Sequence, residues 1–392
     1  MNVTSVKRIH QSDWTDSGVR FLRARDIVSA SKNEEPDDYL YISKEKYDEY
    51  SLISGKVSVG DLLVTGVGTI GVPYLIRNSE PLYFKDGNII WFQNGTKIDG
   101  DFFLYSFFGK AIQDFINESA GIGTVGTYTI ESGKKTPISL PEMKEQQQIG
   151  AYFRNLDHLI TLHQRKYDKL QVLKKAMLEK MFPKNGSSVP EIRFKGFTDA
   201  WEQRKLGEIV ERITRKNENL ESTLPLTISA QYGLIDQNEF FDKRIASKDV
   251  SGYFLVKNGE FAYNKSTSSD APWGAIKRLD RYESGVLSTL YIVFKILDER
   301  KTSSDYIVTY YNTDLWHKGI QAIAAEGARN HGLLNVAPAD FFETNLTMPK
   351  DYAEQQQIGS FFQQLDSLIT LHQRELEKLQ NIKKSMLEKM FV

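Results

Sequence analysis

A stretch of 38 residues occurs twice in this chain, and it constrains the fold more than any other feature. Glu145–Phe182 and Glu354–Phe391 align without a gap; they differ at 11 of 38 positions and so agree at 27. The sequence between the two copies is unlike them. A repeat this close, separated by dissimilar sequence, indicates a duplicated architecture.

Each copy has the pattern of a long amphipathic helix. Apolar residues recur in alternating steps of four and three, as at the a and d positions of a heptad, and only Lys174 and Lys383 interrupt the series. Pro141 and Pro349 precede the copies, where proline suits a helix start. At about 1.5 Å per residue, each helix would be about 57 Å long. The predicted seam consists of Leu156, Ile160, His163, Tyr167, Leu170, Met177, Leu365, Ile369, His372, Leu376, Leu379 and Met386.

An apolar seam needs a partner helix, and for each copy the other copy is a matched partner available within the same chain. One copy alone could be a general interaction helix, but two matched copies favour an intramolecular pair. If the helices pair antiparallel about a pseudo-two-fold axis, only central residues meet their own counterparts. We therefore expect His163 beside His372, with packing as their main role ahead of metal binding. The further expected neighbours are Leu156 with Leu379 and Leu170 with Leu365.

The composition is that of an ordinary globular protein. The chain has 392 residues, of which 40% are hydrophobic and 26% charged, enough for about two to three domains. There is no cysteine, which excludes disulfides and thiolate zinc sites. The N-terminus lacks the apolar core of a signal peptide, and the apolar runs are too short to span a bilayer, so we expect a cytoplasmic protein. The net charge of −1 does not by itself point to nucleic acid, although it allows a locally basic cleft.

Two units of similar length accompany the helices. We predict a first domain over 1–144, the first helix over 145–183, a linker and second domain over 184–353, and the second helix over 354–392. Short segments rich in branched and aromatic residues between turn residues predict strands in both domains. Helices are expected over Phe102–Ile116 and Ser304–Ile323, and short strands over the residues just before Pro141 and Pro349.

The frame of the two domains repeats, but their loops do not. GVPY at 71–74 corresponds to GAIK at 274–277, and ISLP at 138–141 to LTMP at 346–349. In contrast, Val64–Ile70 is replaced by Asn264–Trp273, and Ala120–Ile130 by Ala325–Asn335. Divergent loops on one repeated frame suggest two related heads for two different ligands.

This organisation resembles the specificity subunit of a Type I restriction–modification system. A variable unit ends in a short strand, a proline, EQQQIG and a long helix, and the whole module is repeated. GFTDAWEQRKLGEIV at 196–210 is similar to the start of a recognition domain. The first half has no counterpart of Pro190–Val210, so its domain looks clipped at the N-terminus. The resemblance implies an α+β fold with two similar, mainly β, mixed α/β target-recognition domains, and two long antiparallel helices that form a coiled-coil spacer.

Two motifs that could indicate catalysis are better explained otherwise. Gly121, Gly123 and Gly126 fit the dinucleotide pattern G-x-G-x-x-G, but they follow a predicted helix and precede a β-like run, the reverse of the required context. The DAPW string at 270–273 resembles the Asp-Pro-Pro-Trp motif of adenine methyltransferases, but no glycine-rich methyl-donor site accompanies it. We find no active site and expect a non-catalytic subunit.

The loops of the heads favour contacts with double-stranded DNA. Arg23 and Arg25 are expected to alternate on a strand and to face one side, where guanidinium groups suit phosphates or guanine edges. The candidates in the first domain are Arg23, Arg25, Thr65, Thr69, Tyr74, Thr124, Thr127, Tyr128, Lys134 and Lys135. Those in the second are Lys265, Ser266, Thr267, Ser268, Trp273, Lys277, Arg278, Arg329, Asn330, His331 and Asn335, with Lys277 and Arg278 as phosphate anchors. For each residue, an ordinary solvated loop position remains the alternative.

The resemblance implies a division of labour. Each domain would recognise one half of a bipartite, asymmetric DNA site, and the helices would set the unread spacer, with half-sites about 34 Å apart. Two methyltransferase subunits would dock on this chain, and ATP-dependent restriction subunits would join them. S-adenosylmethionine, ATP and magnesium would belong to those partners, with no cofactor or metal on this chain. The alternative is a coiled-coil adaptor whose two heads bind protein or carbohydrate.

Overall fold

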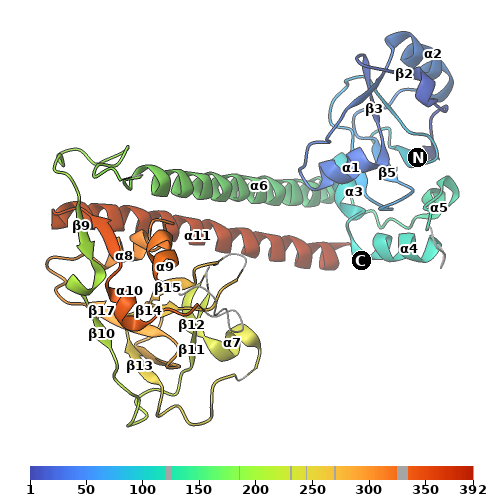
Figure 1. Cartoon of the computed structure of the whole chain (residues 1–392). Helices are drawn as coiled ribbons and strands as arrows, with labels where there is room; N and C mark the ends of the chain where they lie inside the picture. The colour runs from blue at the N-terminus through green and yellow to red at the C-terminus, as the bar shows by residue number, and fades with distance from the viewer. Residues whose placement is uncertain are drawn as a thin grey trace. The chain divides into compact units, whose positions relative to one another are not determined.

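The chain forms two compact units in a computed structural model that describes residues 1–120, 126–184, 186–229, 232–243, 245–268, 271–324 and 334–391. Unit 1 consists of residues 1–166 and 372–392, and unit 2 of residues 167–371. Two long helices, α6 (Met143–Lys180) and α11 (Tyr352–Met390), each contribute one part to each unit (Figure 1).

Unit 1 is built on two four-stranded sheets. The first has the order β1-β8-β5-β6, and the second has the order β2-β4-β3-β7, in which β3 and β7 are parallel. Its elements before α6 are β1 (Asn2–Thr4), β2 (Trp14–Thr15), β3 (Val19–Leu22), α1 (Ala24–Ser31), β4 (Leu40–Ile42), α2 (Lys44–Ser54), β5 (Leu62–Thr65), β6 (Pro73–Leu75), β7 (Leu82–Phe84), β8 (Ile89–Gln93), α3 (Gly100–Ser106), α4 (Lys110–Ser119) and α5 (Ile130–Lys135).

Unit 2 repeats the first of these sheets, in the order β10-β17-β14-β15, and adds the strand pairs β11-β12, β13-β16 and β18-β9. Its elements between the long helices are β9 (Glu202–Lys205), β10 (Val210–Ile213), β11 (Leu226–Ser229), β12 (Gly233–Asp236), α7 (Gln237–Phe241), β13 (Phe254–Lys257), β14 (Phe261–Asn264), β15 (Ala275–Arg278), β16 (Ser284–Leu287), β17 (Ile292–Ile296), α8 (Ser304–Tyr310), α9 (His317–Ile323), α10 (Pro338–Phe342) and β18 (Asn345–Met348). The expected α+β class, with strand-rich domains and two long helices, is confirmed.

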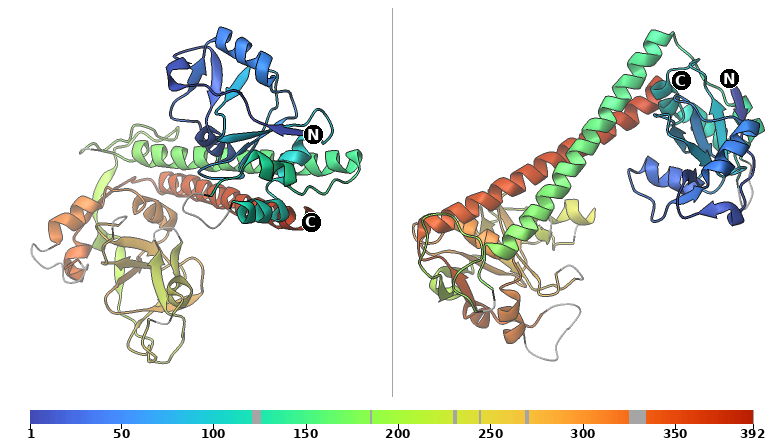
Figure 2. Two further views of the ribbon diagram at one scale, coloured as in Figure 1. Left: turned by 90° about the vertical axis from the view of Figure 1, so that its right-hand side faces the viewer. Right: turned by 90° about the horizontal axis from the view of Figure 1, so that it is seen from above.

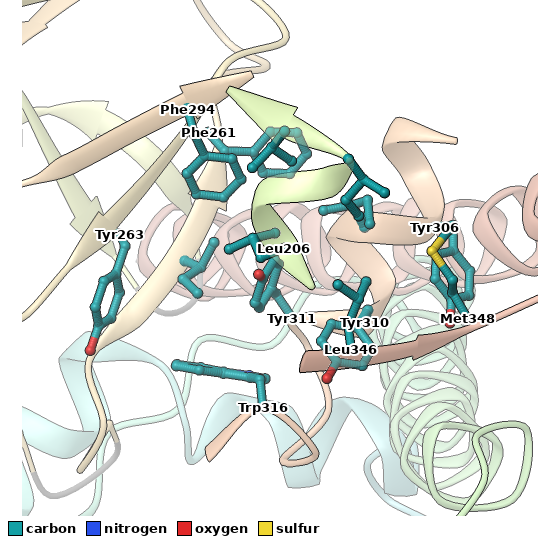
Figure 3. Close-up of a cluster of buried hydrophobic side chains, with 14 of the residues drawn as sticks. Leu206, Phe261, Tyr263, Phe294, Tyr306, Tyr310, Tyr311, Trp316, Leu346 and Met348 are labelled. Carbon is teal, nitrogen blue, oxygen red and sulfur yellow. The ribbon is translucent and has the colours of Figure 1, made fainter. Parts of the chain in front are cut away.

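We call the four-stranded sheet that occurs in both units, β1-β8-β5-β6 in unit 1 and β10-β17-β14-β15 in unit 2, the shared sheet. Each copy of it has a hydrophobic core on each face. Successive side chains of a strand point to opposite faces, so Phe92 of β8 packs with Phe103 and Phe107 on one side, while Trp91 packs with Phe84 on the other. In unit 2, Phe294 of β17 enters the larger cluster, which Figure 3 shows with Tyr306, Leu346 and Met348. A continuous apolar strand such as Ile89–Gln93 therefore has both faces buried.

The EQQQIG motif fixes the start of each long helix to the domain that precedes it in the chain, which belongs to unit 1 for α6 and to unit 2 for α11. Gln146 accepts a hydrogen bond from the amide of Asp99 at 3.0 Å and donates one to the carbonyl of Pro141 at 2.8 Å. Gln355 makes the matching bonds, from the amide of Ser303 at 2.9 Å and to the carbonyl of Pro349 at 2.9 Å. Asp99 and Ser303 cap α3 and α8, so the glutamine ties a proline to a helix start in both units.

The glycine of the same motif allows a close helix contact. A Cβ on Gly150 would lie 2.7 Å from the amide nitrogen of Phe102, and one on Gly359 would lie 2.8 Å from that of Tyr306. Backbone atoms cannot move aside as a side chain can, so only glycine fits at either position. The single glycine of each 38-residue copy is thus the residue that lets the helix pack closely.

The two long helices pair antiparallel within each unit (Figure 2). In unit 1, Leu156 of α6 and Leu379 of α11 join one hydrophobic cluster. In unit 2, Leu170 and Leu365 do the same. The expected histidine contact is confirmed: the Nδ1 atoms of His163 and His372 lie 3.1 Å apart, with ring centroids at 5.1 Å.

The lysines that interrupt the heptads form ion pairs across the helix pair. Lys174 Nζ lies 2.5 Å from Asp366 in unit 2, and Lys383 Nζ lies 2.5 Å from Asp157 in unit 1. The two pairs occupy equivalent positions of the 38-residue repeat. A polar residue in a seam specifies register, because only one alignment provides its partner.

Three expectations about local structure were wrong. The helix expected over Phe102–Ile116 is two helices, α3 and α4, with Gly109 as the N-cap of the second. The helix expected over Ser304–Ile323 is likewise divided into α8 and α9. Within the described residues, the short strand expected before Pro141 is not formed, whereas its counterpart before Pro349 is β18.

Candidate nucleic-acid interface

In unit 1, three segments meet at one end of the shared sheet, where β5 ends. The buried Thr65 donates its hydroxyl to the carbonyl of Thr69 at 2.6 Å and accepts from the amide of Val72 at 2.9 Å, which closes the loop after β5. The amide of Gly66 donates to the carbonyl of Asn88, and the amide of Tyr128 donates to the carbonyl of Gly66. The segments 65–72, 85–88 and 126–129 therefore form one loop cluster.

The candidates in this cluster divide by exposure. Thr69 and Thr127 are exposed, whereas Thr65 and Tyr128 are buried. The Tyr128 hydroxyl is hydrogen-bonded to Thr136, and burial raises the pKa of Tyr128 to about 12. Thr65 and Tyr128 thus support the loops from inside, and Thr69 and Thr127 present hydroxyls to solvent. Tyr74 is half-buried on β6.

The expected placement of Arg23 and Arg25 on one strand was wrong. Strand β3 ends at Leu22, Arg23 is the N-cap of α1, and Arg25 lies within that helix. Asp26 at the third helical position accepts from the Arg23 amide, an arrangement that ends the strand and starts the helix. Both guanidinium groups converge on Asp38, at 2.9 Å and 2.6 Å. Asp26 and Asp38 raise the pKa of Arg23 and hold its half-buried side chain in an ion-pair network.

Two lysines of unit 1 lie at the end of a short helix near the cluster. Lys134 and Lys135 occupy the last turn of α5, where cations are favourable. Both are exposed, and Lys134 forms an exposed ion pair with Glu131 at 2.7 Å. Since exposed pairs of this kind contribute little stability, Lys134 can exchange its partner for a phosphate.

In unit 2, the corresponding end of the sheet, where β14 ends, gathers the corresponding loops. The amide of Leu334 donates to the carbonyl of Lys265 at 2.9 Å, and Lys265 Nζ lies 3.5 Å from the carbonyl of Val336. Burial lowers the pKa of Lys265. Ser266 and Ser268 are exposed, Thr267 is half-buried, and Asn335 is exposed on the adjoining segment.

Three further candidates of unit 2 have partners inside the protein. Trp273 is half-buried, and its carbonyl accepts from the Tyr263 hydroxyl at 2.9 Å. Lys277 donates to Asn312 at 3.0 Å, and its pKa is lowered by burial and then by Lys174. Arg278 pairs with Asp280 at 2.6 Å and with Asp305 at 2.8 Å. These contacts disfavour the expected role of Lys277 and Arg278 as phosphate anchors.

Four candidates lie outside the described residues. They are Thr124, Arg329, Asn330 and His331.

Sequence reasoning missed a third segment in each cluster. The turn 85–88 carries Lys85 and Asn88 beside the loop after β5, because the start of β8 pairs with Thr65 at the end of β5. The equivalent turn of unit 2 carries Ser288 and the exposed Thr289 beside the end of β14. The Asp-Gly dipeptide at 86–87 is a turn signal that could have marked the first of these.

The geometry therefore places the described parts of the divergent loops at the equivalent end of the corresponding sheet in each unit. Within the described residues, no cluster of three or more histidine, aspartate or glutamate side chains is arranged to hold a metal ion. No helix in that part of the chain combines the length and apolar character needed to cross a bilayer.

The comparisons with known proteins agree with this architecture. Residues 12–172 match the model of the Type I restriction modification DNA specificity domain. The chain resembles the specificity subunits of Type I restriction–modification systems. It is 35% identical over 163 residues to a putative Type I restriction enzyme specificity subunit of Haemophilus influenzae, a match that covers 41% of this chain and 39% of that relative's length. The chain spans about two fifths of the curated relative that it matches.

A solved structure extends the likeness of fold to the whole chain. The Type I restriction–modification S subunit of M. genitalium superposes with a TM-score of 0.57, at 13% identity, and the alignment covers 100% of this chain and 93% of that one. At this identity the likeness concerns the fold alone. It includes the two strand-rich domains and the long helices.

Proposed function

We propose that this chain is a sequence-specific DNA-recognition subunit of a Type I restriction–modification complex and has no catalytic site of its own. The observation that carries the proposal is the paired loop cluster. Each unit presents loops of different sequence from the equivalent end of its own four-stranded sheet, at residues 65–72 in unit 1 and, among the described residues, at 264–268 and 271–273 in unit 2. A repeated frame with different loops is the arrangement expected for two half-sites of different sequence.

The helix pair supports a second part of the proposal, the docking of two methyltransferase subunits. Leu159 and Leu162 of α6 are exposed, and so are Leu368 and Leu371 of α11. These leucines are equivalent in the 38-residue repeat, so unit 1 and unit 2 each present one such pair. Two equal apolar surfaces fit two equal partners. S-adenosylmethionine, ATP and magnesium would then be bound by the partner subunits.

A binding experiment with the methyltransferase partner tests the DNA proposal. The complex should shift duplex DNA. The logarithm of its affinity should fall linearly with the logarithm of the salt concentration, because contacts with phosphates release counterions. Methylome sequencing of a host that expresses this gene should show one bipartite, non-palindromic motif. A single continuous palindrome that depends on this gene would contradict two different half-sites. Absence of any DNA shift, together with binding of protein or carbohydrate, would favour the adaptor function instead.

Single substitutions in the loops test which half-site each unit recognises. Thr69→Ala and Thr127→Ala in unit 1 should relax discrimination in one half-site, and Ser266→Ala in unit 2 should relax it in the other, each by about 1–3 kcal/mol if the hydroxyl meets a base edge. Thr15→Ala, an exposed threonine on the other sheet of unit 1, is the matched control and should change neither half-site. Competition binding with single-base variants of the motif measures each effect.

A further inference from the structure

The two loop clusters differ in chemistry at one matched position, directly after the strand that leads into each loop. Gly66 follows β5, and Lys265 follows β14. Their carbonyl groups accept equivalent hydrogen bonds, from the amide of Tyr128 in unit 1 and from that of Leu334 in unit 2. A Cβ on Gly66 would lie 2.6 Å from the carbonyl oxygen of Tyr128. No side chain therefore fits at this position in unit 1, whereas unit 2 carries a lysine there.

The loop after β14 fixes the backbone of Lys265. The side-chain oxygen of Asn264 accepts from the amide of Ser266 at 3.0 Å, and the carbonyl of Lys265 accepts from the amide of Leu334 at 2.9 Å. The side chain of Lys265 is half-buried, whereas its neighbours in the cluster, Ser266 and Asn335, are exposed. Lys265 is thus a half-buried cation among residues that face solvent.

The ammonium group of Lys265 has little to bind inside the protein. It carries three N–H donors, and among the described residues its single hydrogen bond goes to the carbonyl of Val336, at the long distance of 3.5 Å. Burial lowers the pKa of Lys265, because the charged form loses water that no carboxylate of the described chain replaces. An acceptor supplied from outside the protein would offset this cost.

The other half-buried cations among the candidates for DNA contacts are already paired. Arg23 and Arg278 each form ion pairs with two aspartates. Lys277 donates to the side chain of Asn312 at 3.0 Å. Of these half-buried cations, Lys265 is therefore the one that lacks a strong acceptor in the part of the chain that the structure describes.

We propose that Lys265 is a specificity-determining residue of unit 2 and donates to the major-groove edge of a guanine. This inference rests on the proposed DNA recognition. Guanine presents two acceptors at that edge, O6 and N7, whereas adenine presents one acceptor beside an amino donor and thymine one acceptor beside a methyl group. An ammonium group can only donate, so guanine matches it best. Unit 1 has no side chain at the equivalent position, so this contact belongs to one half-site.

A base edge suits this lysine better than a phosphate does. Phosphates lie on the outside of the duplex, where exposed and hydrated lysines such as Lys134 and Lys135 can reach them. The half-buried side chain of Lys265 has less reach than these. The hydroxyl of Ser266 and the amide of Asn335 beside it are groups of the kind that contact base edges.

A base analogue tests the proposal on the complex of the full chain with its methyltransferase partner. The probe is a duplex that carries the motif found by methylome sequencing, with 7-deazaguanine in place of one guanine at a time. Loss of the N7 acceptor should weaken binding of the wild type about fivefold at one guanine. The Lys265→Met complex should bind the unmodified duplex about tenfold more weakly and should lose nothing further at that guanine. Lys265→Arg, which keeps a cation that binds guanine, should retain the preference.

Lys295→Met is the matched control. Lys295 is an exposed lysine on β17 of the same sheet, and it pairs with Glu211 outside the loop cluster. This variant should keep the full effect of 7-deazaguanine.

Three results would overturn the proposal and leave DNA recognition intact. One is a Lys265→Met complex that loses affinity equally for all sequences and shows a weaker salt dependence, because Lys265 would then contact a phosphate. Another is a Lys265→Met complex that still loses affinity with 7-deazaguanine at every guanine to which the wild type is sensitive. The third is a motif without guanine on either strand of its half-sites. A wild-type complex without any sequence preference would instead contradict the proposed function itself, and this inference with it.

Discussion

The histidine pair in the helix seam makes the structure sensitive to pH at the level of single residues. With 3.1 Å between the Nδ1 atoms of His163 and His372, one nitrogen must donate and the other accept, so the contact requires a neutral acceptor ring. Burial, and then the nearness of His163 and Lys166, lower the pKa of His372 below its ordinary value. The folded state therefore disfavours protonation of His372 relative to the unfolded state.

The protein should lose stability as the pH falls. Because the folded pKa of His372 is depressed, the stabilisation is fully present above the unfolded histidine pKa of about 6.5 and is lost as the pH falls through the lower folded value. We expect the Tm to decrease between pH 7 and pH 5, and His372→Gln to flatten this decrease. His158→Gln, at an exposed histidine of α6 outside the seam, should leave this decrease as in wild type. Thermal melts across this range measure both.

The buried glutamine of the EQQQIG motif should matter more than its exposed neighbour. Gln355 is 1% exposed, and its amide links Ser303 to Pro349. Gln355→Ala leaves a buried amide and carbonyl without partners, at a cost of about 1–3 kcal/mol each. Gln356→Ala, at the adjacent exposed position, should change the free energy of unfolding by less than about 0.5 kcal/mol. Urea unfolding monitored by circular dichroism compares the two variants.

At the scale of elements, the junction of each long helix with its unit depends on one glycine. A Cβ at position 359 would lie 2.7 Å from the Cβ of Asp305 and 2.8 Å from the Tyr306 amide nitrogen. We expect Gly359→Ala to destabilise the protein by about 1–3 kcal/mol through overpacking, against the small gain that alanine normally gives a helix. Ser360→Ala, at the next and exposed position, is the control that keeps only that gain. A stabilising effect of Gly359→Ala would contradict the close contact.

The long helices and the repeated frame are the parts of this protein that could be predicted from the sequence. The seam follows from heptad spacing, because a helix presents every third or fourth residue to its partner whatever the surroundings. The histidine contact follows from the repeat once the two helices are taken to pair antiparallel about a pseudo-two-fold axis. The shared frame of the two domains was equally predictable from repeated strings such as GVPY and GAIK. Periodicity and repetition can be recognised in the sequence itself, and they were sufficient to predict the helix seam and the repeated frame of the two domains.

The site was less predictable because burial and partners depend on residues distant in sequence. Arg23 looked like a strand residue facing DNA until Asp26 and Asp38 were placed beside it. Thr65 and Tyr128 have the chemistry of base contacts, yet both are buried within the loop cluster. The lysines at 174 and 383 looked like interruptions, and only the antiparallel register reveals their aspartate partners. Each case required knowledge of a tertiary neighbour.

At the scale of the whole molecule, the proposed function requires the helix pair to act as a spacer between the two half-sites. A test must lengthen both helices together, because the ion pairs Lys174–Asp366 and Lys383–Asp157 fix their register. An insertion in the Lys169–Lys175 region of α6 alone would shift Lys174 away from Asp366. Insertion of one heptad in each helix, between His163 and Tyr167 and between His372 and Leu376, keeps the seam in phase.

Seven residues lengthen a helix by about 10.5 Å, which corresponds to about three base pairs at about 3.4 Å per base pair. We therefore expect the doubly extended protein to direct methylation to a motif with the same two half-sites and a spacer longer by about three base pairs. The half-sites should not change, because the loop clusters at β5 and β14 are untouched. The single-helix insertion, which mispairs the lysines, is the control and should reduce stability without producing a defined longer motif. Methylome sequencing distinguishes these outcomes, and altered half-sites with an unchanged spacer would show that the helices do not set the distance.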